Sequence, residues 1–232
     1  MSSSSHVVGS SGNPTPRIEI LSAEPQRFAA TPIMNFAARI TEPSEREIYT
    51  IALSCQVNID PARRSYDENA RAALFDLFGE PERWGATTRS FMWTQVDVLV
   101  KSFRGSQTFD IPVSCSFDTE LAAVKFFYSV TEGEVPLTFM FSGTVFYRDD
   151  SGGLRLTQVP WSCDARFEMP VSTWRGLVDH FYPNRAWVGV QRETLDALRA
   201  YRQENGLPSL EACVKELLAG ADRPARAGER LA

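Results

Sequence analysis

Alternation of apolar and polar residues dominates the first two thirds of the chain and predicts β-strands. The clearest case is residues 49–59, in which Ile51, Leu53, Cys55, Val57 and Ile59 share one face. Similar alternation marks residues 17–22, 32–40, 92–100 and 107–117. Because only one side of each strand is apolar, we predict antiparallel strands in sheets that are buried on one face.

Two strands depart from this pattern in informative ways. Pro112 cannot donate a backbone hydrogen bond, so the strand over residues 107–117 is predicted at a sheet edge or a bulge. Residues 137–147 are apolar on both sides, which predicts a central strand that is covered on both faces. A hairpin turn at 149–153 follows, and strands at 154–160 and 161–169 complete the β region.

Helical spacing appears in two places. Ser65 and Glu68 form a capping box for a helix that ends at Gly79. Residues 118–130 are ambiguous: the Asp118 cap favours a short helix, whereas the aromatic run within this segment favours a strand, and we predict the helix. After residue 170 the pattern is helical throughout: a helix capped by Ser172 or Thr173, then helices at 193–205 and 209–220.

Runs of strands followed by runs of helices indicate an α+β fold. We predict an antiparallel β-sandwich of about eight or nine strands, with helical insertions, over residues 17–170. A C-terminal helical subdomain, residues 171–220, is expected to pack on it. Residues 1–16 are rich in Ser, Gly and Pro and are predicted to be a disordered leader, and 221–232 a disordered tail.

Composition narrows the class of protein. The chain has 232 residues, 43% hydrophobic and 23% charged, as in ordinary globular domains. Its net charge of −5 argues against a general nucleic-acid binder. The longest apolar run is too short and too interrupted to cross a bilayer, and no signal-peptide pattern is present. We therefore expect a cytoplasmic protein without membrane insertion.

Catalytic chemistry has little support in the sequence. The only histidines are His6, in the predicted leader, and His180, near the end of a predicted helix. No phosphate-binding, dinucleotide-binding or nucleophile-elbow motif is present. We predict a non-enzymatic protein with no catalytic residue and no cofactor. An enzyme would need a deep polar pocket that joins His180 to carboxylates from distant strands.

Cysteines offer the one candidate for metal chemistry. Cys55, Cys115 and Cys163 each lie on the apolar face of a predicted strand, so three thiols could converge inside the sandwich. The other interpretation is that they are small core residues. Structural zinc sites usually pair their ligands at short spacing, and no Cys-x-x-Cys occurs, so we favour the core and predict no metal site.

Amphipathic aromatic residues in the C-terminal region suggest a surface for a partner. The narrow apolar stripes of these helices suffice for packing, and the side chains of Tyr182, Trp187 and Tyr201 add aromatic surface beyond that need. Because such residues dominate protein–protein hot spots, we predict that they bind a protein partner. The alternative is that Trp187 holds the helices onto the sandwich.

Five strings together resemble an uncharacterised bacterial domain family that is common in high-GC bacteria. They are DLFGEPERWG (76–85), FSGTVF (141–146), VPW (159–161), FYPN (181–184) and TLDAL (194–198), and the resemblance covers residues 17–219. The family is associated with gene neighbourhoods of nickel–iron uptake hydrogenases. The resemblance implies an accessory or scaffold role with a hydrogenase subunit as the protein partner. The alternative is a carrier of a small ligand or metal inside the sandwich.

Overall fold

Two antiparallel sheets form the body of the protein in the computed structural model, which describes residues 13–116, 121–185 and 188–221. The first sheet has the order β1-β2-β5, with β1 at Arg17–Pro25, β2 at Ile33–Thr41 and β5 at Ser106–Ser114. The second begins with β4 (Phe91–Val100), β3 (Ile48–Ile59) and β6 (Glu134–Arg148). Both β7 (Leu154–Gln158) and β8 (Asp164–Pro170) then pair with β6. The α+β prediction is confirmed.

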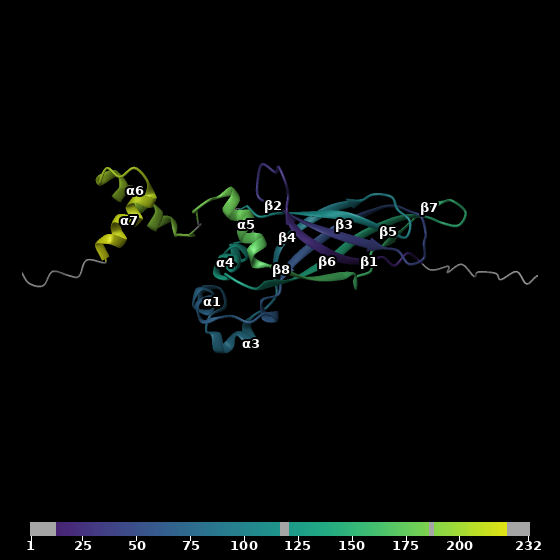
Figure 1. Cartoon of the computed structure of the whole chain (residues 1–232), viewed down its shortest axis with the longest axis horizontal. Coiled ribbons are helices and arrows are strands. Elements are labelled where there is room, and N and C mark those ends of the chain that lie inside the picture. Colours follow the sequence, from purple (N-terminus) through teal and green to yellow (C-terminus); the bar gives the residue numbers. More distant parts are fainter. Residues whose placement is uncertain (1–12, 117–120, 186–187, 222–232) are drawn as a thin grey trace, which may run out of the picture. The chain divides into compact units, whose positions relative to one another are not determined.

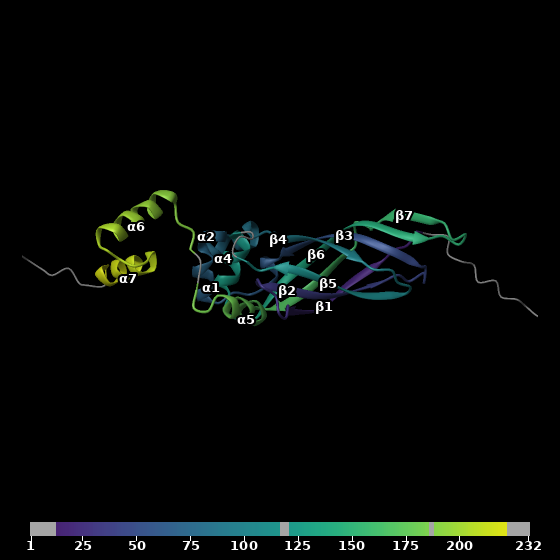
Figure 2. The same ribbon diagram turned by 90° about the horizontal axis from the view of Figure 1, so that it is seen from above.

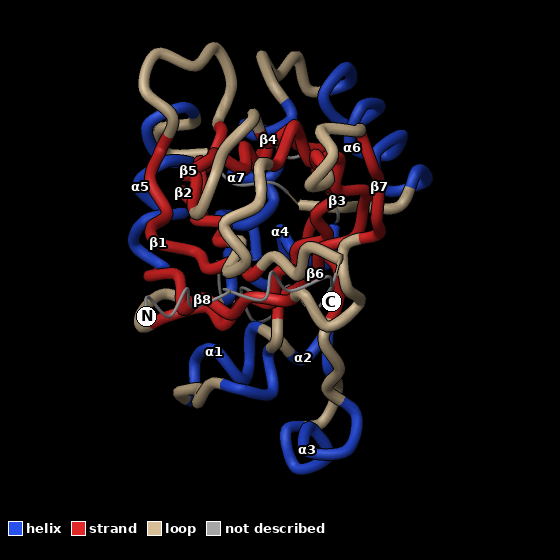
Figure 3. Tube along the Cα trace, turned by 90° about the vertical axis from the view of Figure 1, so that its right-hand side faces the viewer, coloured by secondary structure: helices blue, strands red, loops and turns tan. Residues whose placement is uncertain are grey.

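Strand β6 holds the second sheet together because it is long enough to have two neighbours on one side. Its first half, from Glu134 to Met140, pairs with β8, and its second half, from Thr144 to Arg148, pairs with β7. Its residues 137–147 pair with β3 on the other side. The sheets approach each other where β1 lies near β8 and where β4 lies near β5. Figure 3 shows the strands of the two sheets from one end of the sandwich.

The predicted core faces are confirmed. Alternate residues of β2 and β3 are fully buried, and the ring of Phe36 meets three other rings edge-on, those of Trp93, Phe139 and Phe167. Centroid distances of 5.0 to 6.1 Å place Phe36 in contact with both sheets. Strand β5 is an edge strand, as Pro112 predicted.

Two predictions about the β region are wrong. Strand β6 is central but buried on one face only, since Met140 on its outer face is 48% exposed. The helices between residues 61 and 181 gather at one end of the sandwich (Figures 1 and 2). The strand predicted to begin at Trp161 begins at Asp164, and Trp161 is 96% exposed because it lies in the turn before β8.

Helices at that end come from three segments of the chain. The first holds the short helices α1 (Glu68–Ala73), α2 (Phe75–Phe78) and α3 (Trp84–Thr87) with 3-10 turns at Pro61–Arg63 and Pro81–Arg83; the others are α4 (Leu121–Ser129) and α5 (Val171–Phe181). Asp67, not Ser65, caps α1, because its side chain accepts a 2.7 Å bond from the backbone N–H of Ala70. The helix predicted over 118–130 is confirmed from Leu121 onward.

The chain divides into two compact units between Arg185 and Ala186. The predicted boundary was at residue 170, but α5 packs on the sandwich through its buried face and belongs to the first unit. The second unit is a pair of helices, α6 (Arg192–Glu204) and α7 (Leu210–Ala221). On α7 only Cys213 is buried, whereas the apolar residues Val214, Leu217 and Leu218 are exposed.

The predicted leader and tail lie largely outside the described residues. Of the leader, the structure describes residues 13–16, and here the prediction of disorder is wrong. Pro14 and Pro16 are buried, and the Tyr147 hydroxyl donates a 3.2 Å hydrogen bond to the side-chain oxygen of Asn13. The chain therefore joins the sandwich before β1 begins.

Adjacent residues of β6 give a direct test of one-sided burial. Phe141→Ala should lower the free energy of unfolding by about 3 to 5 kcal/mol, because Phe141 is buried between the sheets. Met140→Ala, one residue earlier on the open face, should cost less than about 1 kcal/mol. Denaturant unfolding of both variants measures the difference, and equal losses would show that the outer face is also covered.

Candidate functional site

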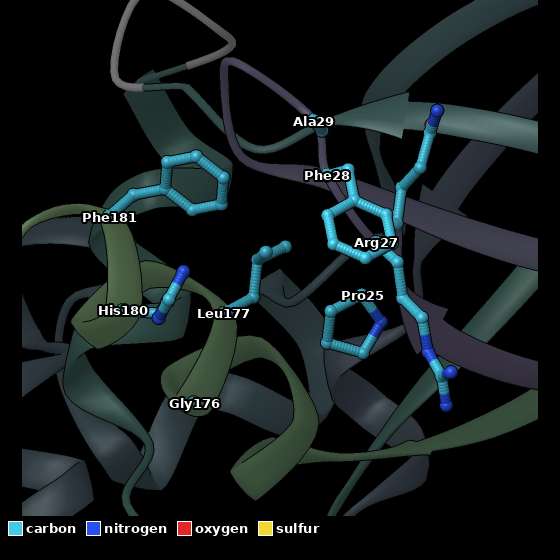
Figure 4. Close-up of a pocket in the computed structure, with 9 residues that line it drawn as sticks. Pro25, Arg27, Phe28, Ala29, Gly176, Leu177, His180 and Phe181 are labelled. Atoms are coloured by element: carbon cyan, nitrogen blue, oxygen red, sulfur yellow. The ribbon is translucent and has the colours of Figure 1, made fainter.

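An apolar groove lies between the loop that follows β1 and the helix α5. Its volume is about 520 Å³. The loop supplies one wall and the last two turns of α5 supply the other. The lining residues are Pro25, Gln26, Arg27, Phe28, Ala29, Gly176, Leu177, His180 and Phe181. Figure 4 shows the side chain of Leu177 between the rings of Phe28 and Phe181.

The loop wall presents an aromatic ring to solvent. Strand β1 ends at Pro25, and the Gln26 N–H donates a 2.8 Å hydrogen bond to the Ile33 carbonyl, which closes the base of the loop. Phe28 has a φ of 58° and a fully exposed side chain. A bulky residue rarely adopts a positive φ, and this one lies in a turn with no contribution from burial of its ring. These features make Phe28 a candidate binding residue.

The helix wall is fixed to the sandwich. Trp174 of α5 stacks on Phe127 of α4, with ring centroids 4.8 Å apart and planes 11° from parallel. The Arg175 guanidinium donates hydrogen bonds of 2.9 and 3.1 Å to the Val130 carbonyl and one of 3.1 Å to the Tyr128 carbonyl. These contacts tie α5 to the end of α4, so the groove has one rigid wall.

The chemistry of the groove favours binding over catalysis. His180 and Arg27 are its ionisable side chains, and the described lining contains no carboxylate. His180 lies edge-on to Phe181, with centroids 5.2 Å apart. General acid–base catalysis needs a second positioned group near the imidazole. What the groove offers is apolar surface that suits a bulky apolar side chain.

Of the three residues predicted to bind a partner, the structure describes Tyr182 and Tyr201, which belong to different units of the chain. Tyr182 follows α5, is half-buried and packs against the core of the first unit. Tyr201 belongs to the second unit, where its hydroxyl donates a 3.4 Å hydrogen bond to Glu216 of α7. This bond gives Tyr201 a part in joining α6 to α7. Trp187 lies outside the described residues, so its two interpretations stay open.

Sequence reasoning did not identify Phe28. The residue belongs to neither the alternating pattern of β1 nor that of β2, because it lies in a polar segment between Pro25 and Pro32. A large aromatic residue in such a segment was the available signal. His180 and Phe181 were noted in the sequence, but only the fold places them opposite this loop.

Cysteines behave as core residues. All four cysteines of the sequence are buried and free, and the described residues contain no group of three or more potential metal ligands. Burial raises the pKa of the Cys55 and Cys115 thiols from 9.0 to about 12 and raises that of Cys163 as well. A thiolate is the form that binds metals, so these thiols are poor ligands at neutral pH.

A second hollow, of about 430 Å³, lies at the turns that include the β6–β7 hairpin. The side chains that line it carry both positive and negative charges. The Glu47 carboxylate forms ion pairs with Arg104 at 3.5 Å and with Arg148 at 3.6 Å. Hydrogen bonds from Ser151, Arg155 and Gly153 hold the pKa of Asp149 well below its usual range. Because both signs alternate here, this hollow is not a single-sign patch for a charged ligand.

Fold and groove together define a β-sandwich protein with a helical end that carries an apolar groove. The chain belongs to a family of unknown function, DUF6084, which it matches over residues 14–226. No curated protein matches the sequence.

Two solved structures share a low similarity with the chain. One is the CARDB domain of a Pyrococcus furiosus protein in complex with di-metal ions, with 7% identity, a TM-score of 0.28 and coverage of 68% of this chain and 92% of that one. The other is a β-glucosidase from Kluyveromyces marxianus, with 7% identity and a TM-score of 0.26. The match covers 67% of this chain and 15% of the glucosidase. Scores this low carry no argument about function.

Membrane insertion through a helix finds no support in the described residues, where no helix combines the length and the apolar character that a bilayer span requires.

The raised thiol pKa values predict how stability depends on pH. Cys55 and Cys115 stay protonated in the folded protein up to about pH 12, whereas in the unfolded chain they ionise above their ordinary pKa of 9.0. The stability gained by keeping these two thiols protonated is therefore fully present below pH 9.0, and it is lost progressively as the pH rises above 9.0. Between about pH 9 and pH 10 the free energy of unfolding should fall by about 1 kcal/mol for each thiol.

Chemical denaturation at a series of alkaline pH values measures this slope. A Cys55→Ala, Cys115→Ala variant serves as the control and should show a shallower decline over the same range. An identical slope in the variant and the original protein would contradict the assignment.

Proposed function

We propose that the protein is a non-enzymatic accessory protein that binds a partner polypeptide through the groove between the β1–β2 loop and α5. The observation that carries the proposal is Phe28, whose fully exposed ring stands at the edge of an apolar groove on a backbone with φ of 58°. Burial of an aromatic ring at an interface contributes strongly to binding, and aromatic residues are typical hot spots. Binding would cover apolar surface that the isolated protein leaves in water.

The groove indicates what kind of polypeptide would fit. Its floor accepts a bulky apolar side chain, since Leu177 and Phe181 lie beside Phe28. Arg27 is exposed at the rim, and no carboxylate lies in the described lining. A segment with a Leu or Phe next to an acidic residue would match both features, because the acidic group could pair with the guanidinium.

The resemblance to a family found beside nickel–iron hydrogenase genes supports a hydrogenase subunit or its precursor as the first partner to test. An arginine-rich, lysine-poor composition agrees with an origin in a high-GC bacterium. We further propose a cytoplasmic location, which would keep the buried thiols reduced.

The alternative function, a carrier of a small ligand or metal inside the sandwich, has less support. The rings of Phe36, Trp93 and Phe139 meet between the sheets and occupy the space that a ligand would need. The buried thiols resist ionisation, which disfavours a metal cargo as well.

Removal of the exposed ring tests the groove. Phe28→Ala should change the free energy of unfolding by less than about 0.5 kcal/mol, because its ring is exposed, yet it should abolish capture of the partner. Trp161→Ala is the matched control, an equally exposed aromatic residue in the turn between β7 and β8.

Affinity capture from the source cells, followed by reconstitution with the purified partner, measures the effect. The same protein should bind the original chain and the Trp161→Ala variant, and it should bind Phe28→Ala at least about tenfold more weakly. Equal binding by all three proteins would rule out the groove as the docking site.

A further inference from the structure

Strand β7 has one side of its backbone unused. The hydrogen bonds from the Asp149 N–H to the Gly153 carbonyl and from the Val159 N–H to the Gly143 carbonyl, both 2.9 Å, mark bonded pairs at the two ends of its ladder with β6. Such pairs alternate along an antiparallel ladder, so Arg155 and Thr157 also bond to β6. The N–H and C=O groups of Leu154, Leu156 and Gln158 therefore point away from β6.

The other sheet edges lie near strands of the facing sheet. Strand β1 lies near β8 and β4 lies near β5, so these edges are partly covered where the two sheets meet. In the described part of the chain, β6 is the only strand that pairs with β7. Figure 1 shows β7 at the end of the sandwich opposite to α4 and α5.

The edge of β7 carries only part of the protection that natural edge strands have. Natural edges are very short, or they carry charged side chains, Pro or a bulge that prevents pairing with another chain. Strand β7 is short and has one charged residue, Arg155, whose guanidinium is paired with Asp149 of the same chain. It contains neither Lys nor Pro, and its register with β6 is regular. Leu154 and Leu156 are 59% and 65% exposed on the outer face of the sheet. An open edge with exposed leucines is a surface that fits another strand.

We propose that a second copy of this chain occupies the edge, through antiparallel pairing of β7 with β7 about a two-fold axis at Leu156. The free backbone groups lie at positions 154, 156 and 158, which are symmetric about residue 156. Pairing in this register bonds Leu156 to the same residue of the second copy and Leu154 to Gln158 on both sides of the axis. Self-complementarity of this kind is what an isologous interface requires.

Charge placement agrees with the same register. Arg155 lies opposite Thr157 of the second copy, so the arginines do not face each other across the axis. The Arg155 guanidinium is already paired with Asp149 of its own chain at 2.9 Å. The leucines of both copies lie on one face and bury each other. Because the strand has only five residues, the interface is small and the dimer is weak and concentration-dependent.

The dimer is independent of the proposed function, since β7 and α5 lie at opposite ends of the sandwich (Figure 1). Partner capture and self-association can therefore fail separately. If β7 instead received a strand of a different protein, the purified chain would stay monomeric at all concentrations, and the proposal of a second copy would be wrong.

Sedimentation velocity of the full chain over a wide range of concentrations tests self-association. The original protein should shift from monomer toward dimer as the concentration rises. Leu156→Lys should remove this shift, because it would place two positive charges opposite each other at the axis. Leu99→Lys, at a leucine of β4 that is 69% exposed, is the matched control and should keep the shift. Loss of the shift in both variants, or in neither, would overturn the β7 assignment.

A cross-linking experiment tests the register. Bonded residues of an antiparallel pair have Cα atoms about 5.5 Å apart, a separation that a short bifunctional thiol reagent such as a bismaleimide spans. Leu156→Cys should therefore yield a covalent dimer with this reagent, since the native cysteines are buried. Leu99→Cys should remain monomeric on a non-reducing gel. Equal cross-linking of both variants, or none with Leu156→Cys, would contradict pairing at the axis.

Discussion

The pairing of β6 with three other strands is the constraint on which the rest of the structure depends. A strand of fifteen residues can serve β3 along one side and both β8 and β7 along the other. Gly143 makes the close approach to β3 possible, because its φ of 145° suits glycine and a β-carbon would collide with the Ala52 carbonyl oxygen. Backbone geometry at one residue thus permits the ladder that carries both ends of the sandwich.

The two halves of β6 lead to two different surfaces. Its first half pairs with β8, which continues directly into α5 and so sets the helix wall of the groove. Its second half extends to β7, whose outer edge stays open. Helices bury the aromatic residues at one end, as the stacked Trp174 and Phe127 show. The groove and the open edge of β7 therefore share no residues.

The described residues contain no group of three or more potential metal ligands. The thiols are buried singly, and His180 faces apolar neighbours in the groove. Exposed apolar residues are instead the unexplained features: Phe28 at the helical end, the leucines of β7 at the other, and the exposed face of α7 in the second unit. Such residues are costly in water unless an interaction covers them.

The sequence by itself determined the strands, their buried faces, most of the helices and the α+β class, because alternation and helical spacing record which side of each element is buried. It also predicted the edge position of β5, since Pro112 lacks an N–H. It did not reveal that one face of β6 is exposed to solvent. An apolar residue such as Met140 gives the same sequence pattern whether or not another layer covers it. The groove was decided by tertiary structure alone: Phe28 and Leu177 are about 150 residues apart in sequence, and only the packing of α5 beside the β1–β2 loop brings them together. The free edge of β7 likewise depends on which strands pair, and local sequence does not encode pairing between distant strands.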